Sequence, residues 1–119
     1  MRFASLGSGS EGNGLVVEVG DTRVLIDCGF RLRDTVARLV RLGLAPESIA
    51  AILVTHEHQD HIGGVAAFAR RYRVPVWLTF VRSVRLLCCV PRDQVGMPPT
   101  IEFVVEYVVS VSVDTGAGL

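Results

Sequence analysis

The order of hydrophobic and polar residues predicts several β-strands in the first 79 residues. Residues 2–6 alternate briefly, and two β-branched runs, Leu15 to Val19 and Arg23 to Ile26, flank a short turn with glycine and aspartate. Such a pair of runs is typical of a β-hairpin. The continuous apolar run from Ile49 to Val54 indicates a strand that is covered on both faces. Together these segments predict a sheet.

Two stretches have the spacing of amphipathic helices. After Asp27, apolar residues recur at helical intervals opposite a polar, arginine-rich face, and Gly43 is expected to end this helix. Its apolar positions are Leu32, Val36, Leu39 and Val40. A second helix is expected to begin near Ile62 and to run up to Tyr72. The run from Val74 to Thr79, with Pro75 at its start, predicts a further strand.

The pattern weakens after Thr79. The segment from Arg82 to Val90 suits a helix or a strand, whereas Ile101 to Val113 is rich in β-forming residues. No internal repeat or low-complexity linker separates the chain into parts. A chain of 119 residues, half of them apolar and 20% charged, is therefore expected to form one globular domain over residues 1–119.

Hydropathy and the N-terminal sequence bear on location. No apolar run approaches the roughly 18 residues needed to span a bilayer, because Glu102 and Glu106 interrupt the richest stretch. The N-terminal residues lead into an alternating pattern without the apolar segment of a signal peptide. These features predict a cytoplasmic protein with no membrane partner.

Cysteine and arginine change this picture little. The three cysteines, Cys28, Cys88 and Cys89, are an odd number, two of them adjacent, which favours reduced thiols that pack as small hydrophobes over metal ligands. Formal net charge is zero, and every cation is an arginine. A stretch without acidic residues contains Arg70, Arg71, Arg73, Arg82, Arg85 and Arg92. This stretch indicates either a solvated face or a surface that holds phosphates.

The glycine and serine residues between positions 7 and 14 predict a loop in which the backbone can come close to a neighbour. A phosphate-binding P-loop is excluded, because such a loop ends in Gly-Lys-Ser/Thr before a helix, whereas a strand is expected here. Two interpretations are open: a long turn between strands, or a segment at the mouth of a functional site.

All three histidines of the chain fall within six residues, together with one aspartate, directly after the buried strand. Residues two apart on an extended chain point the same way, so His56 and His58 can bind one ion. Asp60 and His61 can turn toward a second ion. Imidazole with carboxylate favours zinc without excluding manganese or iron. A pair of such ions indicates hydrolysis, with Asp60 as the candidate catalytic residue. The alternative is a polar strand-to-helix turn in which Asp60 caps the helix.

At these residues the chain resembles the metallo-β-lactamase superfamily, whose signature is His-x-His-x-Asp-His between a strand and a helix. The match extends to Phe3 to Ser10, Leu25 to Phe30 and Ile52 to His61, which are similar to the bacterial YycJ-like branch over residues 1 to about 79. The resemblance implies an α/β (α+β) fold, the αββα sandwich. It further implies two metal ions on the four motif residues, Asp27 as a supporting carboxylate, and phosphodiester or nucleic-acid substrates.

The chain also departs from the family pattern. Family members are longer and supply a further metal-binding histidine, a bridging aspartate in an Asp-Thr-Gly-like segment and a final histidine. No histidine follows His61 here, and Asp114, in Val113-Asp114-Thr115-Gly116, is a candidate for the bridging aspartate that comes early in the chain. We therefore expect an incomplete, N-terminal half of the sandwich, truncated or altered after about residue 79 and prone to self-association through an exposed edge or face. Two functions follow: a metal-dependent hydrolase, or a non-catalytic metal-binding fragment of one.

Overall fold

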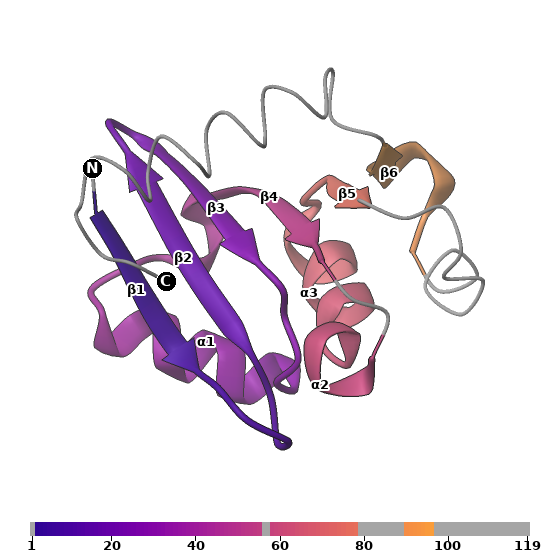
Figure 1. Ribbon diagram of the computed structural model, residues 1–119. Coiled ribbons are helices and arrows are strands. Elements are labelled where there is room, and N and C mark those ends of the chain that lie inside the picture. Colours follow the sequence, from indigo (N-terminus) through magenta and orange to yellow (C-terminus); the bar gives the residue numbers. More distant parts are fainter. Residues whose placement is uncertain (1, 56–57, 79–89, 97–119) are drawn as a thin grey trace.

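The computed structural model describes residues 2–55, 58–78 and 90–96, which form a mixed six-stranded sheet with the strand order β1-β2-β3-β4-β5-β6 (Figure 1). The strands are β1 Arg2–Gly7, β2 Gly14–Val19, β3 Thr22–Ile26, β4 Ile49–Val54, β5 Val76–Leu78 and β6 Val95–Gly96. The first three strands pair antiparallel, and β3 to β6 pair parallel. The helices are α1 Leu32–Arg41, α2 Gln59–Ile62 and α3 Val65–Tyr72, with 3₁₀ turns η1 Pro46–Ser48 and η2 Arg92–Gln94.

The predicted hairpin and the buried strand are confirmed. Strands β2 and β3 pair antiparallel about the turn that contains Gly20 and Asp21, and β4 has the bounds that its apolar run predicted. From Ala51 to Val54 every side chain of β4 is buried, although successive side chains point to opposite faces of the sheet. The strand predicted from Val74 is shorter, since β5 begins at Val76, after Pro75.

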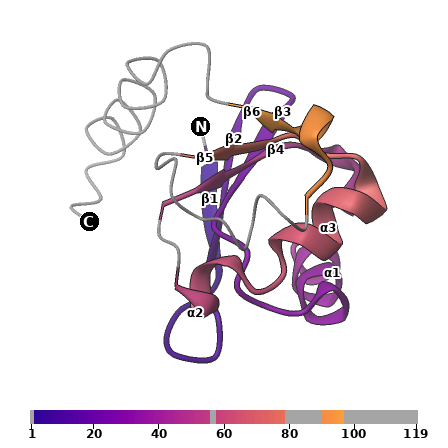
Figure 2. The same cartoon turned by 90° about the vertical axis from the view of Figure 1, so that its right-hand side faces the viewer.

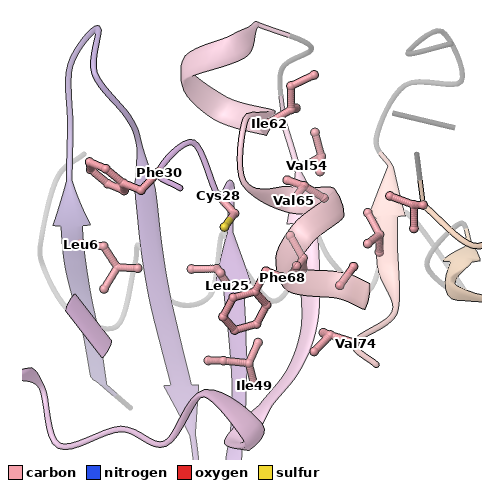
Figure 3. Packing of buried hydrophobic residues seen from close by; sticks show 14 of the residues in the cluster. Leu6, Leu25, Cys28, Phe30, Ile49, Val54, Ile62, Val65, Phe68 and Val74 are labelled. Carbon is pink, nitrogen blue, oxygen red and sulfur yellow. The ribbon is translucent and has the colours of Figure 1, made fainter. Parts of the chain in front are cut away.

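Helices α1 and α3 lie on the same side of the sheet (Figure 2). The register aligns Val16 with Leu25, Leu25 with Ile52, and Ile52 with Val76, so one row of apolar side chains crosses four strands. This row joins a single core cluster with Leu39 of α1 and with Val65 and Phe68 of α3. Figure 3 shows Phe68 among Leu25, Ile49 and Val65. The core therefore fills the space between the sheet and its helices.

The face that α1 presents to the core differs from the predicted one. Val40 is 59% exposed, whereas Thr35 is fully buried beside Leu39. Thr35 can be buried because its hydroxyl donates to the carbonyl oxygens of Arg31 at 3.0 Å and Phe30 at 3.2 Å. The predicted stop is confirmed, since α1 ends at Arg41 and Gly43 follows with a φ of +74°.

The single helix predicted from Ile62 to Tyr72 is wrong, because the chain forms two helices separated by Gly63 and Gly64. Glycine has a low helix propensity. Gly64 also packs so tightly that a side chain there would overlap the carbonyl oxygen of Phe30, and its amide donates to the carbonyl of Cys28 at 2.8 Å. Contact with the loop after β3 therefore interrupts the helix.

Cys28 is buried, as the sequence predicted, and its sulfur lies 3.7 Å from Oγ1 of Thr35. Burial raises the pKa of this thiol from 9.0 to about 11, so it is a neutral thiol at pH 7. No helix in the part of the chain that the structure describes is long and apolar enough to cross a membrane. Cys88, Cys89, the segments from Arg82 to Cys89 and from Ile101 to Val113, and the expected change after residue 79 fall outside the described residues.

Candidate metal centre

The candidate site begins where β3 and β4 end. These strands are parallel neighbours, so Asp27, which follows β3, and Thr55, which follows β4, lie side by side. The Asp27 carboxylate accepts hydrogen bonds from the backbone N–H of Thr55 at 2.8 Å and from its hydroxyl at 2.6 Å. Asp27 has a φ of +59°, a conformation that aspartate tolerates better than most residues. Asp27 is also buried, and its two hydrogen bonds from Thr55 hold the carboxylate in one orientation.

His61 of α2 faces this carboxylate. Its Nδ1 lies 2.8 Å from Oδ2 of Asp27. Because a carboxylate only accepts hydrogen bonds, Nδ1 carries the proton and donates it. Nε2, on the other side of the ring, lies 3.7 Å from Oδ2 of Asp60. An imidazole with one nitrogen on a carboxylate and the other directed toward a ligand position is the usual arrangement of a metal-binding histidine.

Asp60 is held from the loop between β1 and β2. Nδ2 of Asn13 donates to Oδ2 of Asp60 at 3.0 Å, and the backbone N–H of Asn13 donates to the carbonyl oxygen of Asp60 at 2.7 Å. Figure 2 shows this loop beside α2. The glycine-rich loop therefore lies at the candidate site, which favours the second of the two interpretations of that loop.

Of the remaining candidates from the sequence, only His58 lies within the described residues. His58 is exposed at the N-cap position of α2. Asp60 lies in the first turn of α2, so it is not the N-cap that the alternative interpretation required. His56 and Asp114 lie outside the described residues. Within residues 2–55, 58–78 and 90–96, no group of three or more His, Cys, Asp or Glu side chains is gathered so that it could hold an ion.

The chemistry of the donors at this site suits a divalent ion. Imidazole and carboxylate form the donor set that zinc accepts, and Asp27 fixes the tautomer of His61 so that Nε2 is the nitrogen turned toward Asp60. The site therefore has one oriented imidazole and one oriented carboxylate next to each other.

Asn13, Gly29 and Thr55 contribute to the site but were not among the candidates from sequence. A side chain on Gly29 would overlap the carbonyl oxygen of Asp60, so glycine permits the close approach of this loop to α2. An asparagine in a glycine-rich loop and a glycine two residues after the strand-end aspartate were the available signals. Neither signal identifies its partner, because the partners lie far along the chain.

The described part of the arginine-rich stretch is remote from this site. Arg70, Arg71 and Arg73 are exposed at the C-terminal end of α3 and just beyond it. That end leads into β5, which runs parallel to β4, so these arginines lie near the start of β5, whereas the candidate site lies at the opposite ends of the strands. For these three the position favours a solvated face. Arg82 and Arg85 lie outside the described residues, and the side chain of Arg92 is not described.

Comparison with known proteins identifies the family. The model of the metallo-beta-lactamase superfamily matches residues 7–79, and the chain belongs to this superfamily. Members of the superfamily are hydrolases that bind divalent metals, generally zinc. This result confirms the resemblance inferred from the histidine motif and from the strand ends.

Within the superfamily, the chain is similar to individual nucleases and to a lactamase of known structure. The chain is 37% identical over 97 residues to the exodeoxyribonuclease YycJ of Bacillus anthracis. This alignment covers 79% of this chain and 37% of that relative. It is 35% identical over 83 residues to a ribonuclease of Thermus thermophilus, covering 66% of this chain and 19% of that relative. Among solved structures, the Rm3 metallo-beta-lactamase aligns with a TM-score of 0.53 and 30% identity over 62% of this chain and 28% of that one. The chain thus spans about a third of the length of the exodeoxyribonuclease it matches.

Proposed function

We propose that this chain belongs to a metal-dependent hydrolase that cleaves phosphodiesters in nucleic acid, and that it supplies ligands to the metal ions. In this proposal His56, His58, Asp60 and His61 hold two divalent ions, zinc in preference to manganese or iron, with Asp60 also the catalytic residue. Asp114 is the candidate bridging ligand. The observation that carries the proposal is the chain of contacts from Asp27 through His61 to Asp60.

The protein groups have distinct parts in this proposal. Asp27 keeps the proton of His61 on Nδ1 and so directs Nε2 away from itself. Thr55 holds Asp27 with two hydrogen bonds, which prevents the carboxylate from turning toward the ion in place of the imidazole. Divalent ions in such sites supply hydroxide near neutral pH and stabilise negative charge on the attacked group.

The preference for nucleic acid rests on the relatives. Those named exodeoxyribonuclease and ribonuclease are 37% and 35% identical to this chain, and the lactamase structure is 30% identical. Phosphodiesters are therefore preferred over β-lactams as substrates.

A second candidate function is metal binding without catalysis. It is supported by the residues within this chain, where no histidine follows His61 although the resemblance implies further metal-binding histidines. Metal catalysis depends on fixed coordination and a closed cavity, and displacement of catalytic groups by about 1 Å can cost a hundredfold in rate. We therefore expect activity far below about 1 turnover per second.

Two measurements on the purified chain separate these functions. Elemental analysis after dialysis against zinc or manganese should find bound metal, which the paired changes His56→Ala and His58→Ala should remove. Cleavage of a generic phosphodiester and of single-stranded DNA should then be weak and should fall further in Asp60→Ala. The matched control is Asp21→Ala, since Asp21 is an exposed acid in the β2–β3 turn.

The outcomes are distinct. No bound metal in the unchanged chain would refute both functions. Bound metal with equal cleavage by Asp60→Ala would leave metal binding alone. Turnover at ordinary enzyme rates would indicate a site completed by a second copy of the chain.

A further inference from the structure

Asn13 joins three segments that are far apart in the sequence. Its Nδ2 donates to Oδ2 of Asp60 at 3.0 Å and to the carbonyl oxygen of Asp60 at 3.1 Å. Its backbone N–H donates to the same carbonyl at 2.7 Å, and its own carbonyl accepts from Gly29 at 2.9 Å. The β1–β2 loop, the loop after β3 and the first turn of α2 therefore meet at one residue.

From this geometry we infer that Asn13 is a positioning residue for the Asp60 carboxylate, which it turns toward the ligand position that Nε2 of His61 also faces. The inference rests on the proposed function, because it assigns Asn13 a role in the affinity and geometry of the metal site. Asn13 would act only through Asp60.

The chemistry of the amide suits this role. A primary amide donates a hydrogen bond without bringing a charge, so Asp60 keeps the negative charge that attracts a cation. An arginine or lysine in the same place would neutralise the carboxylate and would compete with the ion. The Nδ2 bond uses Oδ2 on one side and leaves further lone pairs on the carboxylate.

The orientation of the Asn13 amide is itself fixed. Its Oδ1 accepts from the backbone N–H of Gly9 at 3.1 Å, and its Nδ2 donates to the carbonyl of Gly9 at 2.9 Å. The carboxylate and carbonyl oxygens of Asp60 and the carbonyl oxygen of Gly9 only accept hydrogen bonds, so the amide nitrogen must face them, and the amide oxygen is left to accept from the Gly9 N–H. The glycine-rich loop therefore sets the donor in place before any ion binds.

Backbone contacts around Gly29 also hold these segments together. A Cβ atom on Gly29 would overlap the carbonyl oxygen of Asp60 and would lie 2.9 Å from the backbone nitrogen of Asn13. Alanine at position 13 can form the same backbone hydrogen bonds to Asp60 and Gly29. Asn13→Ala should therefore remove the side-chain donor and leave the three segments together.

The experiment uses cobalt(II) chloride as the probe, with the unchanged chain, Asn13→Ala, Asn13→Asp, Asp60→Ala and the double variant Asn13→Ala/Asp60→Ala. Glu11→Ala is the matched control, because Glu11 is an exposed residue of the same loop. Cobalt affinity, the visible absorption spectrum at saturation and the thermal unfolding midpoint of the metal-free chain are measured for each. The spectrum reports the coordination of the ion, which a loss of stability alone would not alter.

We expect Asn13→Ala to weaken cobalt binding about 10- to 100-fold, as the loss of a residue that orients a ligand does. Its saturated spectrum should shift toward that of Asp60→Ala, and Glu11→Ala should match the unchanged chain. Asn13→Asp should bind more weakly than the unchanged chain despite its added charge, because it replaces the donor with an acceptor. In the Asp60→Ala background, Asn13→Ala should change the affinity by less than about twofold, since the two residues act together.

An unchanged affinity and spectrum in Asn13→Ala would overturn the inference and leave the proposed function intact. An equal loss in the Asp60→Ala background would also overturn it, because the effect would not pass through Asp60. A chain that binds no cobalt before any substitution would overturn both. If Asn13→Ala unfolds, Asn13→Asp, which keeps the size of the side chain, serves for the same comparison.

Discussion

Each end of the sheet holds a carboxylate of low exposure, and the two are used differently. Asp27, at the ends of β3 and β4, accepts hydrogen bonds from Thr55 and from His61. Glu18, near the opposite end, lies between Arg2 of β1 and Arg23 of β3, with Nε of Arg23 2.5 Å from Oε2. Glu18 thus completes an ion-pair cluster, whereas Asp27 orients a histidine.

The difference shows how a buried acid can be recognised as part of a site. Hydrogen bonds from Arg2 and then Arg23 lower the pKa of Glu18, and both partners satisfy it within the sheet. The donors to Asp27 are instead a backbone amide, a hydroxyl and an imidazole, and the other nitrogen of that imidazole lies near Asp60. A carboxylate whose partner faces a second acid is therefore the better functional candidate.

The largest expected effect is a loss of stability on replacing Gly29, at the site end of the sheet, compared with replacing Gly43 near the other end. Gly29→Ala should lower the free energy of unfolding by about 3 kcal/mol or more, because the methyl group would overlap backbone atoms of Asp60 that cannot move alone. Gly43→Ala, beyond α1, should cost about 1 kcal/mol, because Gly43 has open space around it but a φ of +74°. Urea unfolding followed by circular dichroism measures both. Equal losses would show that the site end is no more tightly packed than the other.

The second effect concerns Asp27. Asp27→Ala should lower the free energy of unfolding by about 2 to 3 kcal/mol, because it leaves the Thr55 amide without its acceptor and places alanine at a φ of +59°. Asp27→Asn should cost less, about 1 kcal/mol, since asparagine tolerates that φ. It should still weaken zinc binding about tenfold, because His61 loses its charged partner. Zinc affinity equal to that of the unchanged chain in Asp27→Asn would refute the orienting role.

The smallest effect is expected for Glu18→Gln and depends on pH. The folded pKa of Glu18 lies below its ordinary value of 4.5, so its ion pairs stabilise the fold above pH 4.5, and this contribution is lost as the pH falls through the lowered folded pKa. The effect should be small, since the side chain of Arg2 is 80% exposed. Urea unfolding of both forms between pH 7 and pH 3 should show a difference that disappears in acid. A difference that grew in acid would contradict this assignment.

Local patterns in the sequence determined much of the fold. The hairpin, the bounds of β4 and the end of α1 before Gly43 follow from residue periodicity and turn residues, which act over a few positions. The same reasoning was wrong about Val40 and about a single helix after the histidines. At α1, hydrogen bonds from the Thr35 hydroxyl to Arg31 and Phe30 allowed a polar residue to be buried. After the histidines, the packing of Gly64 on Phe30, which is distant in sequence, interrupted the helix.

The sequence also located the histidine motif, because three histidines within six residues need no structure to be noticed. Only the tertiary structure placed Asp27 against His61, 34 positions away, and Asn13 against Asp60, 47 positions away. Those contacts depend on the parallel pairing of β3 with β4 and on the return of the β1–β2 loop to α2. Periodicity describes which face of its own element a residue occupies, whereas the partner across a gap is decided by how the elements pack together.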